Sequence, residues 1–78
     1  MIVDHLPYVG RLEKRPLERI DLVVVHCTEL PDLATARVYG ERIHHEASRT
    51  GNAGHYYVER DGRVHEWVPP DRVAHHVR

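Results

Sequence analysis

The sequence predicts a small α/β domain, a mixed β-sheet flanked by helices, with the order strand, helix, hairpin. Three features indicate this class. Residues 20–25 form a short aliphatic run, apolar positions recur at helical spacing over residues 33–47, and an Asp-Gly pair joins two strand-like segments further along the chain. Residues 1–19 contain two prolines and one glycine, and are expected to form an irregular N-terminal arm.

The run over residues 20–25 (IDLVVV) is β-branched and almost continuously apolar. This pattern is typical of a strand covered on both faces. The run ends at His26, so we expect this imidazole to sit at the tip of a buried strand, on the rim of a cleft. Cys27 follows and is expected to be buried as a small apolar side chain.

A helix is predicted after the break at Pro31, with Asp32 as its N-terminal cap. We expect it to end near Ser48, which would place His44 and His45 in its second half. The residues that recur on one stripe are Leu33, Ala36, Gly40, Ile43 and Ala47.

A hairpin is predicted from the strands at residues 55–59 and 64–68, because the central Asp61-Gly62 pair tolerates positive φ. Trp67, Tyr57 and Val58 are expected to be packing residues. Residues 73–78 are read as a further extended segment. Neighbouring residues on such a segment point to opposite faces, so one of His75 and His76 is expected to look into the same cleft as His26.

Length and composition limit the possibilities. A chain of 78 residues fits one small domain or part of one, and chains of this size bury only about 60% of their unfolded surface. One helix leaves the second face of the first strand uncovered, so we expect the rest of the domain to lie in further polypeptide. The net charge of −1 gives no electrostatic case for nucleic acid or membrane as a partner. A single cysteine and the lack of a long apolar run favour a cytoplasmic location.

Three segments in this order resemble the zinc N-acetylmuramoyl-L-alanine amidases, the group that contains muropeptide-recycling amidases, phage lysozyme-type amidases and peptidoglycan recognition proteins. They are VVVHCT at 23–28, GHYYVERDGRV at 54–64 and AHH at 74–76. The resemblance covers residues 20–78, read as the N-terminal part of a single zinc amidase domain, and leaves the arm at 1–19 unassigned.

The resemblance implies zinc as cofactor, with His26 as one ligand, and peptidoglycan or muropeptide fragments as substrate. His55 and His76 match substrate-binding positions. The other two zinc ligands, and a catalytic glutamate, would come from the remaining C-terminal polypeptide of the domain, so no catalytic residue is assigned in this chain. Gly54 stands where some members have a catalytic tyrosine, which argues against that branch.

The activity implied is zinc-dependent hydrolysis of the amide between N-acetylmuramic acid and L-alanine, with the 78-residue chain inactive alone. The alternative is a non-catalytic peptidoglycan-binding module of the same fold. A third hypothesis, a histidine-rich metal buffer, ranks lowest because the eight histidines are scattered along the chain.

Overall fold

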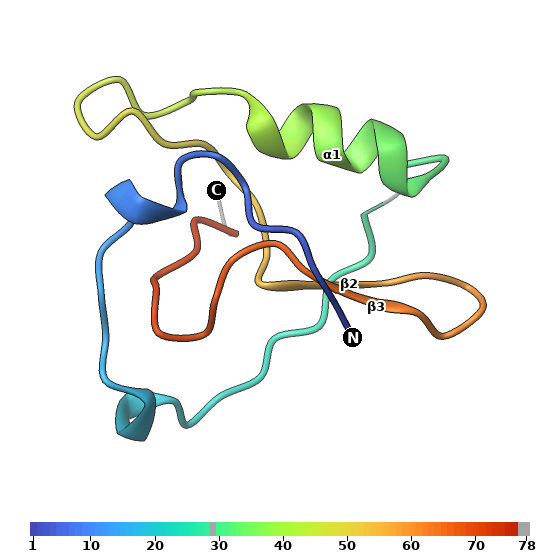
Figure 1. The fold of residues 1–78 in the computed structure, drawn as a ribbon, viewed down its shortest axis with the longest axis horizontal. Coiled ribbons are helices and arrows are strands. Elements are labelled where there is room, and N and C mark those ends of the chain that lie inside the picture. The colour runs from blue at the N-terminus through green and yellow to red at the C-terminus, as the bar shows by residue number, and fades with distance from the viewer. Residues whose placement is uncertain (29, 77–78) are drawn as a thin grey trace.

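The computed structural model describes residues 1–28 and 30–76 and has an α/β fold, as predicted (Figure 1). Its elements are β1 (Ile2–Val3), two 3₁₀ turns (Val9–Arg11 and Leu17–Arg19), α1 (Leu33–Glu41), β2 (Tyr56–Val58) and β3 (Val64–Glu66). The sheet is mixed, with the order β1-β3-β2: β1 runs parallel to β3, and β2 runs antiparallel to it. Among the described residues, no helix has the length and apolarity needed to cross a membrane.

The hairpin β2–β3 confirms the prediction from the Asp-Gly pair. The turn closes when the amide of Gly62 donates to the carbonyl of Glu59 at 2.9 Å, and Gly62 has a φ of 92°. The Asp61 carboxylate accepts from the amide of Arg63 at 3.0 Å, which further fixes the turn and lowers the pKa of that carboxyl. A single left-handed residue is therefore enough here, and glycine supplies it without strain.

Helix α1 begins as predicted but ends earlier. The Asp32 carboxylate accepts from the amide of Thr35 at 2.7 Å, and the side chain and the amide of Thr35 together lower the pKa of the Asp32 carboxyl. The helix stops at Glu41 instead of near Ser48, so the prediction that His44 and His45 are helical is wrong. Beyond the helix the chain turns back, with the amides of His44 and His45 both donating to the carbonyl of Thr50, a residue with no exposed surface.

The hydrophobic core lies between α1, β3 and the N-terminal residues. Trp67 is 2% exposed and stacks on Tyr57 with ring centroids 3.8 Å apart, so two of the three predicted packing residues contribute. The prediction for Val58 is wrong: it lies on the open edge strand β2 and is 70% exposed. Much of the rest comes from residues 1–19, expected as an irregular arm, which form β1, the two 3₁₀ turns and part of this core. The buried residues are Leu6, Tyr8, Leu12, Ala36, Ala53, Trp67, Val68 and Ala74.

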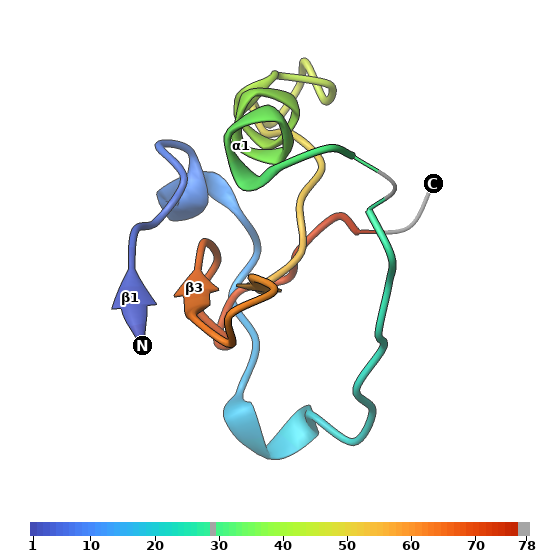
Figure 2. The same cartoon turned by 90° about the vertical axis from the view of Figure 1, so that its right-hand side faces the viewer.

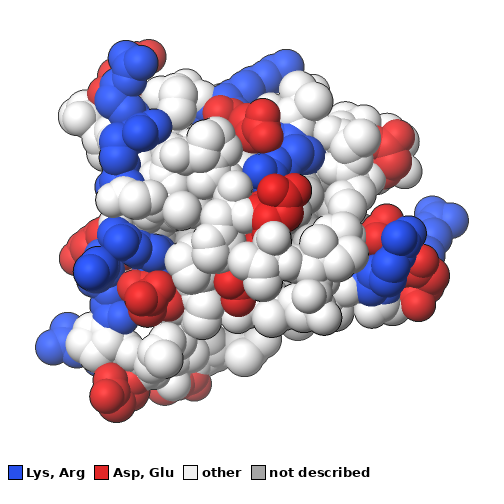
Figure 3. Space-filling view, in the orientation of Figure 1, with Lys and Arg blue, Asp and Glu red and all other residues white. Residues whose placement is uncertain are grey.

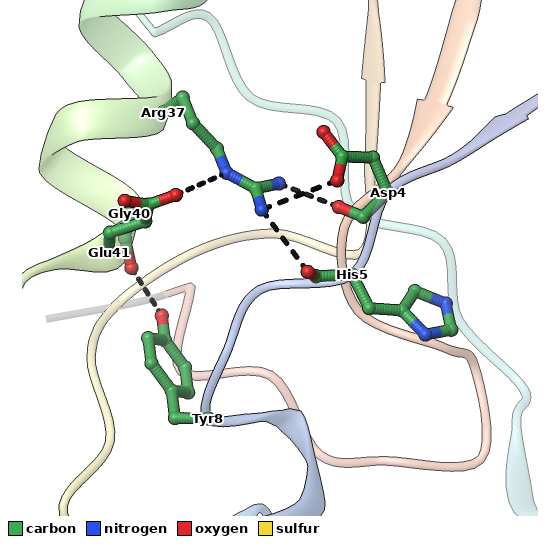
Figure 4. Close-up of polar contacts among 6 residues, drawn as sticks. All are labelled: Asp4, His5, Tyr8, Arg37, Gly40 and Glu41. Atoms are coloured by element: carbon green, nitrogen blue, oxygen red, sulfur yellow. Dashed lines mark hydrogen bonds and ion pairs between the residues drawn. The ribbon is translucent and has the colours of Figure 1, made fainter.

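Arg37 ties α1 to the N-terminal residues (Figure 4). Its guanidinium donates to the carbonyls of Asp4 and His5, at 2.6 and 3.1 Å, and pairs with Glu41 at 2.8 Å. The Tyr8 hydroxyl donates to the carbonyl of Gly40 at 2.5 Å from the same side. The helix is therefore held by its polar side as well as by its apolar stripe.

Residues 20–25, which we call the valine segment, do not form the predicted buried strand. They have no strand partner in the described structure, and Leu22, Val23 and Val25 are 73%, 83% and 88% exposed. Both ribbon views show this part of the chain running apart from the sheet (Figure 1, Figure 2). An apolar strand needs a sheet neighbour and a covering layer, and the described residues supply neither.

Candidate functional site

A groove separates the valine segment from the sheet and α1. Its volume is about 1340 Å³, and it is lined on one side by residues 22–28 and on the other by residues 52–61, with the start of α1 and residues 75–76 completing it. The edge of β2 that faces away from β3 has no strand partner among the described residues. All three predicted site residues, His26, His55 and His76, line this groove.

His26 and His76 are brought together across 50 residues of sequence. Nε2 of His26 lies 2.8 Å from Nδ1 of His76, with the ring centroids 5.0 Å apart. One of the two facing nitrogens carries the proton that joins them, so one ring donates and the other accepts. The sequence predicted that one of His75 and His76 would look into the same cleft as His26 and did not choose between them. In the structure His76 contacts His26 while both His75 and His76 line the groove, and His26 sits at the end of an exposed segment rather than a buried strand.

The environment favours a neutral His76. His76 is exposed, but partial desolvation is the main cause that lowers the pKa of its imidazole, and the nearby rings of His26 and His55 and the guanidinium of Arg15 lower it further. A neutral imidazole keeps a lone pair on one nitrogen, which lets it accept a hydrogen bond or bind a metal ion.

His55 is half-buried at the entrance to β2, where its carbonyl accepts from the amides of Trp67 and Val68 at 2.9 and 3.2 Å. Its Nε2 lies 2.8 Å from the carbonyl oxygen of Arg72. A carbonyl oxygen only accepts, so this nitrogen carries the proton and donates. The ring is thus fixed in orientation, and among the described residues its Nδ1 has no hydrogen-bond partner.

Other residues singled out from the sequence are not part of the His26–His76 contact. His75 lines the same groove, but its ring packs against His45 at a tilt of 45°, with centroids 4.5 Å apart. Cys27 is exposed, which contradicts the expected burial: without a folded strand, the side chain that follows His26 has no interior to enter. Glu29, three positions after His26 in the sequence, lies outside the described residues.

Arg15 is a site residue that sequence reasoning missed. Its backbone amide donates to the carbonyl of Asp71 at 2.8 Å, and its Nε donates to the carbonyl of Pro70 at 3.0 Å. These bonds place the guanidinium in the groove beside His55 and His76. Nothing in the local sequence marks Arg15, because the bonds that position it come from a segment more than 50 residues later.

The described residues do not make a complete zinc site by themselves. Among them, no group of three or more His, Cys, Asp or Glu side chains is placed to hold one ion. A catalytic zinc usually has three protein ligands and one open position. His26 and His76 offer imidazole nitrogens of the right chemistry, so the donors present fit part of such a site.

The charged side chains do not form a continuous field of one sign on the face shown in Figure 3, where acidic and basic groups are interspersed. The local charge of the groove therefore depends on a few residues rather than on the protein as a whole.

Comparison with known proteins identifies the family. No curated protein and no solved structure matches the chain. The profile of the N-acetylmuramoyl-L-alanine amidase family matches residues 16–78, which includes the valine segment, α1, the hairpin and the three site histidines. The match covers most of the chain and includes the three segments that resemble this family, at 23–28, 54–64 and 74–76. The chain therefore belongs to the N-acetylmuramoyl-L-alanine amidase family.

Proposed function

We propose that this chain contributes one wall of the active site of a zinc-dependent amidase that hydrolyses the bond between N-acetylmuramic acid and L-alanine. Membership of the family supports amidase activity on peptidoglycan in general. The observation that carries the finer proposal is the contact between Nε2 of His26 and Nδ1 of His76, at 2.8 Å on the wall of the groove.

In this proposal His26 is a metal ligand, and zinc would supply a Lewis acid for the scissile carbonyl and lower the pKa of bound water to about 7. His76 lies against His26 and can orient it or contact the substrate amide. His55, held through its Nε2 by the carbonyl of Arg72, presents a fixed edge to the peptide. The groove between the valine segment and β2 would receive the muropeptide.

The proposal requires ligands beyond the residues that the structure describes, because these contain no group of three suitable side chains. We therefore expect the isolated chain to bind zinc weakly and to hydrolyse nothing. Hydrolysis is expected only when further polypeptide of the same domain supplies the remaining ligands and a carboxylate that moves the proton.

The incomplete set of metal ligands among the described residues also favours a second candidate, a module that binds peptidoglycan without cutting it. A groove lined by four histidines, but without a complete ligand set among the described residues, can hold a muropeptide by hydrogen bonds and apolar contact alone. The two candidates differ in whether the complete domain turns over its substrate.

The deciding experiment measures hydrolysis of N-acetylmuramoyl-L-alanyl peptides by the complete domain, with His26→Ala as the test variant. His44→Ala is the matched control, because His44 is exposed and lies outside the groove of His26. The amidase proposal predicts that His26→Ala abolishes hydrolysis and stoichiometric zinc, while His44→Ala changes neither. Full turnover by His26→Ala would overturn it, and binding without turnover by the unaltered domain would establish the second candidate.

A further inference from the structure

The groove contains a cation whose charge no neighbouring carboxylate balances. Among the described residues, no carboxylate oxygen lies within ion-pair distance of Arg15. The carboxylates that line the same groove are occupied elsewhere. Asp32 caps α1, while Glu59 and Asp61 each contact Arg63.

The hydrogen bonds around Arg15 leave one end of its guanidinium free. Nε donates to the carbonyl of Pro70 at 3.0 Å and so fixes the plane of the group. Nη2 lies 3.3 Å from Nε2 of His55, but that nitrogen already donates to the carbonyl of Arg72 at 2.8 Å. A ring nitrogen that donates its proton has no lone pair left to accept one, so Nη2 gains no acceptor from His55.

Nη1 also has no hydrogen-bond partner among the described residues. The outer pair of nitrogens, Nη1 and Nη2, therefore has two parallel donors without an acceptor among the described residues, on a side chain that lines the groove. This fork matches the two oxygens of a carboxylate, and a partly buried arginine forms its strongest contacts with such an anion.

The support beneath Arg15 is rigid. Residues 13–15 run beside residues 71–73, with the amide of Val73 donating to the carbonyl of Glu13 at 2.8 Å and a bridge between Lys14 and Arg72. A preorganised cation loses little freedom when it binds, which favours a specific contact over a loose surface attraction.

We infer that Arg15 is the anchor of a carboxylate-binding site in the groove, and that the carboxylate is one carried by the peptide of the muropeptide substrate. The assignment of the peptide as the source rests on the proposed function. The site lies beside His55 and His76, so a bound carboxylate would place the peptide along the wall that holds both histidines. Arg15 is a specificity residue in this inference and takes no part in bond cleavage.

The test uses two probes that differ only in charge: N-acetylmuramoyl-L-alanyl-D-glutamate, and the same compound with both carboxylates converted to amides. Binding to the full 78-residue chain is followed by NMR titration, with the side-chain ¹⁵N signals of Arg15 as the local readout. We expect the dicarboxylate to shift these signals and to bind about tenfold more tightly than the diamide, because a hydrogen bond to a charged group is typically worth that much.

Arg15→Gln is expected to remove this preference and to weaken binding of the dicarboxylate about tenfold. Arg19→Gln is the matched control, since it removes the same charge from an exposed arginine outside the groove and should leave the affinity unchanged. Arg15→Lys keeps the charge but loses the planar fork, and should bind with an intermediate affinity. If Arg15→Gln does not fold, the inference is tested by comparing the affinities of Arg15→Lys and of the unaltered chain for both probes.

Equal affinity of the unaltered chain for the two probes would overturn the inference, as would undetectable binding of the dicarboxylate. A failure of this kind is distinct from failure of the proposed function. A complete domain that hydrolyses both probes equally would refute the carboxylate site alone, and one that binds the dicarboxylate through Arg15 without hydrolysis would refute only the amidase proposal.

Discussion

The packed side of the molecule and the valine segment are built from similar aliphatic residues but differ in what surrounds them. Leu6 and Val68 are each 1% exposed, whereas Val23 and Val25 are 83% and 88% exposed. The amide of Leu6 donates to the carbonyl of Trp67 at 2.9 Å, while residues 21–28 make no backbone hydrogen bond within the described structure. An apolar pattern shows that a segment is stabilised by burial. The segment becomes part of a sheet only where a neighbouring strand is available to pair with it.

The largest expected difference between the two regions comes from truncating Trp67. This side chain is 2% exposed and stacks on Tyr57, and the guanidinium carbon of Arg37 lies 5.1 Å from the centroid of its ring, so Trp67→Ala removes both contacts. We expect a loss of about 3–5 kcal/mol in the free energy of unfolding, enough to unfold a chain of this size. Denaturant titration followed by circular dichroism measures it.

Val25→Ala is the control from the other region. Because Val25 is 88% exposed, its truncation should change the free energy of unfolding by less than about 0.5 kcal/mol. Equal losses of unfolding free energy for the two variants would show that the valine segment is packed in solution. The two regions would then not differ in packing.

Gly51→Ala should have the next largest effect, because the packed side has no room at this position. A Cβ there would lie 2.0 Å from the carbonyl oxygen of Arg42 and 3.0 Å from the Tyr8 hydroxyl. We expect about 1–3 kcal/mol of destabilisation from the forced backbone shift. Gly54→Ala, on the open side with no atom within 4 Å, should change stability by less than about 0.5 kcal/mol, and a similar midpoint shift for both variants would contradict the packing described here.

A smaller effect on the free energy of unfolding is expected from deprotonation of the Tyr8 hydroxyl at alkaline pH. Burial is the main cause that raises the pKa of Tyr8 to about 12 from 10.0. The folded state therefore holds this proton more tightly than the unfolded state, and the associated stability is complete below pH 10 and is lost as the pH rises toward about 12. Thermal unfolding measured between these pH values should show the loss.

Tyr8→Phe should reduce stability at neutral pH by about 1 kcal/mol through loss of the bond to the carbonyl of Gly40, and should flatten the alkaline dependence. Tyr39→Phe, at an exposed position, should leave the dependence in place. An unchanged alkaline slope in Tyr8→Phe would assign the titration to another group.

Local patterns predicted the elements whose causes are local. The Asp-Gly turn and the Asp32 cap each depend on residues within four positions, and both form as expected. The helix end was predicted too late because Ile43 and Ala47 continue the apolar stripe of the helix. In the structure the chain turns back before them, because the amides of His44 and His45 bond to the carbonyl of buried Thr50. The core contribution of residues 1–19 depends on contacts with residues more than 30 positions away, which no local pattern reports.

The candidate site shows the same division. His26 and His76 were expected in one cleft from the alternation of an extended segment and from the family resemblance, and they lie in contact. Arg15 was missed because its position is set by the carbonyls of Pro70 and Asp71. A residue that is positioned by distant backbone groups cannot be recognised from the residues next to it in the sequence.

Native-state hydrogen exchange tests the contrast between the two regions most directly, because it reports each backbone amide separately. We predict slow exchange for the amides of Leu6 and Trp67, which donate to carbonyls at 2.9 Å. The amides of Val23, Val24 and Val25 should exchange at close to the rate of an unstructured peptide. Protection of these three valines equal to that of Trp67 would contradict the account, since it would mean that the segment leading to His26 is already paired as a strand.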